Sequence, residues 1–183
     1  MKIISVNVGR PRQIDWRGRR VTTSIWKTPV KGRLRVGALN LEGDEQSDLS
    51  VHGGSDKAVY AYPAEHYDFW RSELPKIEFP FGAFGENLTI EGLLEAEVMI
   101  GDRYEIGSAE FQVTQPRLPC FKLAIRFGRD DMIKRFLRSG RTGFYLAVLR
   151  EGVIESGDAI QFAGGDENAQ SVARVAADVW ASA

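Results

Sequence analysis

The chain has 183 residues, 43% of them apolar and 27% charged, with a formal net charge of −1 at pH 7. This length and composition predict one soluble globular domain, and the near-neutral charge argues against binding of a nucleic acid polymer. No apolar run approaches the roughly 20 residues that a membrane span needs, so no membrane partner is expected.

The N-terminal segment predicts a β-strand rather than a signal peptide, because it lacks the length and cleavage site of an export signal. Ile4, Val6 and Val8 alternate with polar residues, which is typical of a half-buried strand with these three side chains on its apolar face. The sequence has a single cysteine, Cys120, and no export signal. We therefore expect a cytoplasmic protein whose thiol stays reduced.

Further short strands are predicted along the chain. Residues 110–114 alternate between apolar and polar, and residues 144–149 form a nearly continuous apolar run. The Gly-Asp pairs at 101–102 and 157–158 each precede a short alternating segment, and Gly37-Ala38 is placed similarly. Short strands separated by such turns are typical of a β-barrel or β-sandwich, so the fold is predicted to be mainly β.

A first helix is predicted between Pro63, in its first turn, and Pro75, which ends it, with Tyr67, Trp70 and Leu74 on one face. A second is capped by Asp130 or Asp131 and ends at Gly140. Its buried stripe is expected to consist of Ile133, Phe136 and Leu137.

The C-terminal part divides from the rest at Gly164-Gly165-Asp166, which is typical of a domain end. We predict a domain over residues 1–163 and a short helical tail over residues 164–183. A helix over residues 168–180 is too short to be stable alone, so it must pack against the domain or fray.

Cys120 lies in the segment Gln115-Pro116-Arg117-Leu118-Pro119-Cys120-Phe121-Lys122. Two prolines restrict the backbone around it, which predicts a stiff loop. Arg117 and Lys122 lie close in sequence, and neighbouring cations favour the thiolate, the form that attacks electrophiles or ligates metals. The alternative is a small buried hydrophobic residue without reactivity.

A second candidate segment contains His52-Gly53-Gly54 and Lys57. Glycine allows the backbone to approach a ligand closely, successive N–H groups can hold an anion, and Lys57 adds positive charge. The alternative is a polar turn before a strand at residues 58–60.

Two further segments have both functional and structural interpretations. Glu86 and Asn87 could form a hydrogen-bonding pair facing a pocket, or a turn that enters a strand at Leu88. Arg138 and Arg141 could clamp a phosphate, because guanidinium matches phosphate geometry, or they could be favourable cations at a helix C-terminus.

Taken in order, these segments make the chain resemble the MOSC domain family, and within it the stand-alone bacterial YiiM-like group. The resemblance covers about residues 1–162. It is carried by Ile25-Trp26-Lys27-Thr28-Pro29-Val30, by residues 43–48, by Val51-His52-Gly53-Gly54, by residues 56–60 and 84–89, by the Cys120 segment, and by Gly143-Phe144-Tyr145.

The resemblance implies a mostly antiparallel β-barrel with a few small peripheral helices. It also implies a pocket for the molybdenum cofactor (molybdopterin), with Cys120 as the protein ligand to molybdenum or as the carrier of a sulfane sulfur. Members of the family reduce N-hydroxylated bases. We assign the binding of the cofactor's phosphate and pterin to Lys27, Lys57, Asn87, Arg117, Lys122 and Arg141.

The leading hypothesis is a molybdenum-cofactor enzyme that reduces N-hydroxylated small molecules such as hydroxylaminopurines. Cys120 would anchor the metal and His52 would supply or relay a proton. No flavin, haem or iron–sulfur motif is recognisable, so electrons would come from a donor protein.

Two alternatives remain open: a carrier that receives sulfur from a sulfur donor or passes on the cofactor, and an interaction module with an inert cysteine. One departure from the group is the tail, because YiiM-like proteins continue into a three-helix region where this chain has about 20 residues. Whether the chain forms a homodimer is left open by the sequence.

Overall fold

The computed structural model describes residues 1–46 and 54–181. Within these residues the chain forms twelve β-strands, one short 3-10 helix (η1, Ser55–Lys57) and four α-helices. The α-helices are α1 (His66–Glu73), α2 (Phe121–Phe127), α3 (Met132–Ser139) and α4 (Val172–Ala181). None of these described helices has the length and apolar character needed to cross a bilayer.

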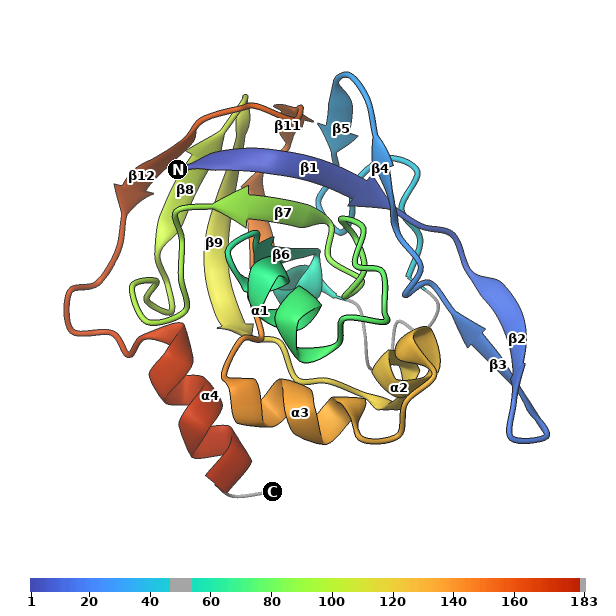
Figure 1. The fold of residues 1–183 in the computed structure, drawn as a ribbon. Coiled ribbons are helices and arrows are strands. Elements are labelled where there is room, and N and C mark those ends of the chain that lie inside the picture. Colours follow the sequence, from blue (N-terminus) through green and yellow to red (C-terminus); the bar gives the residue numbers. More distant parts are fainter. Residues whose placement is uncertain (47–53, 182–183) are drawn as a thin grey trace.

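Eight strands form one mixed sheet that curls around an apolar interior (Figure 1). In spatial order they are β12 (Ile160–Gly164), β8 (Arg103–Ile106), β9 (Ala109–Pro116), β10 (Phe144–Arg150), β6 (Val59–Pro63), β7 (Leu88–Glu91), β1 (Lys2–Val8) and β4 (Thr28–Val30). Described pairings in this sheet are antiparallel except that of β6 with β7.

Two small two-stranded sheets complete the β structure. One pairs β11 (Gly152–Ile154) with β5 (Leu34–Val36), and the other is the hairpin of β2 (Arg12–Trp16) and β3 (Arg19–Thr23). The hairpin projects from the body of the molecule beside α2 (Figure 1).

The mainly β, mostly antiparallel fold is confirmed, but the described residues do not form a closed barrel, with β12 and β4 at the sheet's edges. The beginning of β1 nevertheless reaches the turn before β12. Lys2 forms an isolated bridge with Ala159, Ile3 N donates to Asp158 O at 2.9 Å, and Ile160 N donates to Met1 O at 3.1 Å. The sheet therefore curls almost fully round without a continuous ladder at the seam.

Strand β6 connects the two hydrophobic cores of the molecule. Its side chains alternate between its faces, so Val59 and Ala61 join an aliphatic core while Tyr60 and Tyr62 join an aromatic one. The aromatic core gathers residues of α1, α3 and the loop before β7, including Trp70, Phe84 and Phe136. Both faces of β6 are therefore buried, which explains why its five residues are all inaccessible.

Several predicted strands are confirmed. Residues 110–114 lie in β9, residues 144–149 in β10, and the Gly-Asp turns at 101–102 and 157–158 lead into β8 and β12. The strand expected after Gly37-Ala38 is wrong, because residues 38–40 form a bend that exposes Leu39 and leaves Leu41 only an isolated bridge to Val36.

The face assigned to β1 is also corrected. Ser5 and Asn7 are buried, whereas Ile4 and Val8 are only partly buried. The reason is a buried polar network, in which Ser5 Oγ donates to Asn7 Oδ1 at 2.8 Å and Asn7 Nδ2 donates to Thr89 Oγ1 at 3.1 Å. Alternation alone could not reveal this, because it assumes that polar residues face water.

Three helices were predicted, and each is found. Tyr67, Trp70 and Leu74 are buried by α1 as expected, although Pro63 ends β6 instead of opening the helix. Helix α3 ends at Gly140, whose φ of 66° is left-handed, and it buries Met132 and Phe136.

Helix α4 packs against the domain and does not extend from it. It buries Val172 and Ala176, and Val172 N donates to Val98 O at 2.8 Å. Helix α2 is a further element that the sequence did not predict: the segment expected to be a stiff loop around Cys120 gives way to this helix at Phe121.

Candidate functional site

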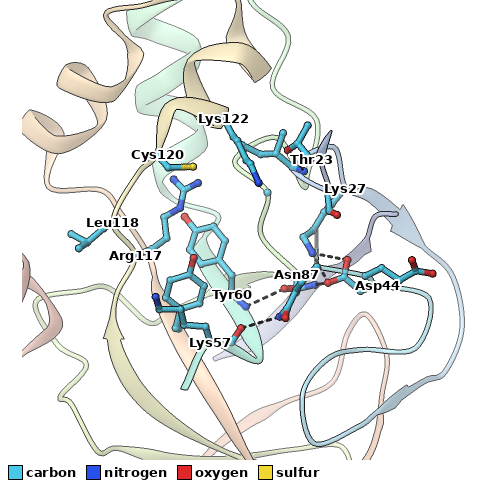
Figure 2. A pocket seen from close by; sticks show the side chains of 16 residues that line it. Thr23, Lys27, Asp44, Lys57, Tyr60, Asn87, Arg117, Leu118, Cys120 and Lys122 are labelled. Carbon is cyan, nitrogen blue, oxygen red and sulfur yellow. Dashed lines mark hydrogen bonds and ion pairs between the residues drawn. The ribbon is translucent and has the colours of Figure 1, made fainter. Parts of the chain in front are cut away.

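A cavity opens beside Cys120, and Figure 2 shows the side chains that point into it. Its lining residues come from three strands (the end of β3, β6 and β10), from the helices η1 and α2, and from four connecting segments. These segments lie before β4, after Leu41, before β7, and between β9 and α2. The described lining residues are Thr23, Ser24, Ile25, Lys27, Asp44, Glu45, Gln46, Lys57, Tyr60, Gly85, Asn87, Arg117, Leu118, Cys120, Lys122 and Tyr145.

Most of the predicted site residues are brought together here. Among the described residues, the wall contains the thiol of Cys120, four cationic side chains and two carboxylates. The cations are Lys27, Lys57, Arg117 and Lys122. Positive charge next to a single soft sulfur donor suits an anionic ligand that also carries a metal or an electrophile.

Cys120 is half-buried and immediately precedes α2, with extended backbone at φ −119° and ψ 174°. Its carbonyl accepts a hydrogen bond from Leu123 N at 2.9 Å, which starts the helix. Pro119 before it and the helix after it fix the backbone on both sides, so the thiol is held by rigid elements. The loop that was expected around Cys120 thus ends at the cysteine, where a helix begins.

Arg117 is 6% exposed, and its guanidinium carbon lies 5.2 Å from the ring centroids of both Tyr60 and Phe136. Burial acts to lower the pKa of Arg117, but Tyr60, Tyr145 and Cys120 act in the opposite direction and the net pKa is raised. Its Nη1 atom has no hydrogen-bond partner among the described residues. A buried charged donor without an acceptor is costly, so an acceptor that reached this atom would be stabilised by it.

Lys27, Asp44 and Asn87 form a buried network on the opposite wall (Figure 2). Lys27 Nζ lies 2.5 Å from both carboxylate oxygens of Asp44, and Asn87 Nδ2 donates to Asp44 Oδ2 at 2.8 Å. Burial lowers the pKa of Lys27, and Asp44 opposes this shift. Lys27 is thus already paired with Asp44, which offsets its positive charge. Its ammonium group could still donate one hydrogen bond to a ligand.

The same network anchors the strands around the cavity. Gly9 N donates to Asp44 Oδ1 at 2.8 Å, and Asn87 Oδ1 accepts from Tyr60 N at 3.1 Å. Asn87 therefore joins β6 to the segment after Leu41, and its role in the wall is at least partly structural.

The other predicted binding residues divide between the cavity and elsewhere. Lys122, on the first turn of α2, and Lys57, in η1, both line the cavity. The structure does not bring Arg141 there: its guanidinium carbon lies 4.0 Å above the ring of Phe69 and its Nη1 donates to Ser139 O. His52 lies outside the described residues.

Glu86 does not line the cavity, in contrast to Asn87 beside it. It is fully buried and accepts hydrogen bonds from Gly82 N at 2.7 Å, Phe84 N at 3.1 Å, Thr89 Oγ1 at 2.9 Å and the Tyr67 hydroxyl. Burial raises the pKa of Glu86, while these donors oppose the shift. The carboxylate therefore shapes the loop that presents Asn87 to the cavity.

Two glycines allow close approach of backbone around this region. A Cβ at Gly82, where φ is 85°, would lie 2.7 Å from Lys27 O, and one at Gly143, where φ is 65°, would lie 2.3 Å from Ala61 O. Both distances are shorter than side chains tolerate. These glycines therefore allow the segment with Lys27, and strand β6 with Tyr60, to pack closely around the cavity.

Several residues of the cavity wall were given no role from the sequence, among them Asp44, Tyr145 and Ser24. Asp44 and Tyr145 belong to recognised segments, but neither was assigned a function. Ser24 is 9% exposed and its Oγ has no hydrogen-bond partner among the described residues. A serine between two recognised segments carries no sequence signal for such a position.

The described residues contain no group of three or more His, Cys, Asp or Glu side chains that could hold a metal ion. His66, on α1, instead forms a buried pair with Glu95, with Nε2 2.7 Å from Glu95 Oε2. Gly143 N donates to Glu95 Oε1 at 2.7 Å. Glu95 therefore links α1 to Gly143, which directly precedes β10.

Comparison with known proteins finds a matching family and related sequences. The profile of the MOSC domain matches residues 48–161. The uncharacterised protein YflK of Bacillus subtilis (strain 168) is 44% identical over 170 residues, which is 93% of this chain and 76% of YflK. Protein YiiM of Escherichia coli (strain K12) is 41% identical over 136 residues, which is 73% of this chain and 61% of YiiM.

The fold is shared with solved structures. The crystal structure of YiiM from Geobacillus stearothermophilus aligns with a TM-score of 0.80 at 40% identity, covering 98% of this chain and 83% of that one. A protein of Gibberella moniliformis (strain M3125 / FGSC 7600) named "Reductase" is 37% identical over 161 residues, which is 86% of this chain but 28% of the fungal protein. The chain thus spans less than two thirds of two of these curated relatives.

Proposed function

The chain belongs to the MOSC domain family, as its sequence suggested, and from this premise we propose that it binds the molybdenum cofactor beside Cys120 and reduces N-hydroxylated small molecules. The observation that carries the proposal is that Arg117, whose buried Nη1 has no partner among the described residues, lines the same cavity as the Cys120 thiol. The relative named a reductase supports redox chemistry.

The residues present fit such a cofactor. Thiolate is a soft ligand that suits molybdenum, and Cys120 is its source in this cavity. Arg117 Nη1 and Ser24 Oγ are buried groups that need partners, and phosphate or pterin atoms provide them. Lys57 and Lys122 would neutralise the phosphate charge from two sides of the cavity.

When bound, the cofactor supplies a redox-active metal that accepts and delivers electrons. The reaction consumes two electrons and two protons: the N–O bond breaks, an N–H bond replaces it, and the oxygen leaves as water. Because no flavin, haem or iron–sulfur motif is recognisable in the sequence, the electrons come from a donor protein.

The chain's own residues hold the reactants and their protons. Burial raises the pKa of Tyr145, with Arg117 opposing, so its hydroxyl stays protonated at neutral pH and offers a hydrogen bond at the cavity wall. Arg117 remains charged and orients an anionic oxygen. His52 would supply or relay a proton, a role that rests on the sequence alone.

The test is the metal and pterin content of protein produced in a host with intact cofactor synthesis, beside the Cys120→Ser variant. We expect molybdenum, pterin and reduction of an N-hydroxylated purine by reduced methyl viologen in the parent protein. The variant should lose the metal and turnover, while its thermal unfolding should match that of the cofactor-free parent protein.

Equal turnover in the Cys120→Ser variant would sink the proposal. A persulfide mass shift on Cys120, with no metal and no turnover in the parent protein, would instead identify a sulfur carrier.

A further inference from the structure

The β2–β3 hairpin carries an unusual concentration of positive charge. Residues 10–20 contain five arginines and a single carboxylate, Asp15, although the whole chain has a net charge of −1. The side chains of Arg10, Arg17 and Arg20 are 76%, 66% and 71% exposed. Such a local excess on a near-neutral protein attracts an acidic partner and aligns it.

The carboxylates near these arginines bind them weakly. Arg20 lies 4.0 Å from Asp15, whose side chain is 83% exposed, and Arg17 pairs with Asp130, which is 67% exposed. Exposed ion pairs contribute little free energy, so a partner's carboxylates can replace them at small cost.

Apolar groups lie next to this charge and beside Cys120. Leu118 and Phe121 are 46% and 51% exposed, and they flank the cysteine within two residues. Phe121 also lines a hollow on the hairpin, together with Trp16, Arg17, Arg19, Arg20 and Val21. An exposed aromatic and apolar centre ringed by arginines is typical of a protein-binding surface.

We propose that this surface, the hairpin docking surface, formed by Trp16, Arg17, Arg19, Arg20, Val21 and Phe121, binds an acidic electron-transfer protein that carries a flavin or an iron–sulfur centre. The inference rests on the proposed function, which requires external electrons. Phe121 directly follows Cys120, so a partner seated on the hollow contacts the segment that carries the thiol.

The charge distribution favours a protein over a nucleic acid. Polynucleotide binding needs cations that follow a backbone, whereas these are gathered on one hairpin around apolar side chains. A small surface with complementary charge also suits the short-lived complexes of electron transfer.

The experiment compares the double variant Arg19→Glu, Arg20→Glu with the control Arg33→Glu, Arg35→Glu. The control makes the same change in charge at β5, where Arg33 and Arg35 are also exposed and each lies 3.4 Å from a carboxylate. Binding of an acidic bacterial flavodoxin is measured at increasing ionic strength, with thermal unfolding as a check of the fold.

We expect the hairpin variant to bind flavodoxin at least about tenfold more weakly than the parent at low salt, with a flatter dependence on salt. The control variant should stay within about twofold of the parent. Flavodoxin-driven reduction of the N-hydroxylated purine should fall in parallel, while reduction driven by methyl viologen should be unchanged.

Equal effects of the two double variants, or no flavodoxin binding to the parent protein, would overturn the docking surface. Tighter binding of a short DNA duplex than of flavodoxin through Arg19 and Arg20 would also overturn it, in favour of a polynucleotide. No turnover with methyl viologen in the cofactor-loaded parent would refute the proposed function alone, since the binding measurement does not depend on activity.

Discussion

Two buried polar regions lie close together and differ in how completely their hydrogen bonds are satisfied. Glu86 is surrounded by four donors, whereas Arg117 and Ser24 in the cavity wall each have an atom without a partner among the described residues. A satisfied cluster stabilises the fold, while an unsatisfied one costs stability and gains its partner from a ligand. The difference separates residues that build the site from those that we propose to bind the cofactor.

The largest effect is expected from Glu86→Ala, which would leave several buried donors without an acceptor. We expect a loss of about 3 kcal/mol or more in the free energy of unfolding, measured by urea denaturation. The control is Glu91→Ala, because Glu91 is half-exposed in its pair with Lys2 and should cost under about 1 kcal/mol. A loss below about 1 kcal/mol for Glu86→Ala would remove the distinction between the two regions.

Arg117→Met should weaken cofactor binding and leave the stability of the fold nearly unchanged. Cofactor retention through gel filtration should fall about tenfold or more, while the free energy of unfolding should stay within about 1 kcal/mol of the parent. Arg126→Met is the matched control, because Arg126 Nε is also buried and unpaired among the described residues but does not line the cavity. Equal loss of cofactor in both variants would show that the cavity does not depend on Arg117.

The stability that Glu95 contributes should depend on pH, because this buried carboxylate has hydrogen-bond partners. Burial raises its pKa, but His66 and Gly143 N–H act oppositely and the net pKa is lowered. Because the pKa of Glu95 is lower in the folded state, its ionisation stabilises the fold at pH values above the unfolded-state pKa. This stabilisation is lost as the pH falls through the folded-state pKa. Glu95→Gln should therefore cost about 1 kcal/mol at pH 7 and progressively less below about pH 4.

Urea denaturation of parent and variant at several pH values checks this expectation. For Glu86, where burial raises the pKa, the sign is reversed: its ionisation weakens the fold as pH rises. A cost of Glu95→Gln that grows as the pH falls below about 4 would contradict the assigned direction.

Ser24→Ala should have the smallest effect. Removing a hydroxyl without a partner should leave stability unchanged or raise it by a few tenths of a kcal/mol, and should weaken cofactor retention only several-fold. Thr23→Ala is the control, because Thr23 Oγ1 already accepts from Ile25 N at 3.2 Å and should lose stability instead. A clear loss of stability in Ser24→Ala would mean that its hydroxyl has a partner in the folded protein.

Sequence reasoning predicted the elements whose signal is local. The alternation of residues 110–114, the apolar run of 144–149 and the amphipathic face of α1 were confirmed, because burial of one face determines such patterns. The predicted face of β1 was wrong because Asn7 donates to Thr89, which is 82 residues away in the sequence, and Ser5 joins the same buried network through Asn7. Helix α2 was missed because the prolines before it predicted a loop.

The candidate site was predictable to the extent that its residues lie in recognisable segments. Lys27, Lys57, Asn87, Arg117, Cys120 and Lys122 all line one cavity. The position of Arg141 over Phe69 depends on packing between the α3 region and α1, which spacing along the chain does not encode. The unpaired atom of Ser24 is likewise a product of tertiary geometry.

The seam between β1 and β12 has a consequence for synthesis on the ribosome. Met1 to Ile3 contact residues near 158–160, and β1 also pairs with β7, so this end of β1 can form all of its contacts only after residues 158–160 have been translated. Contacts this distant in sequence slow folding, because a long loop must close before they form. The nascent β1 therefore emerges with an unpaired edge, and the curled sheet is completed only after Ile160 has left the exit tunnel.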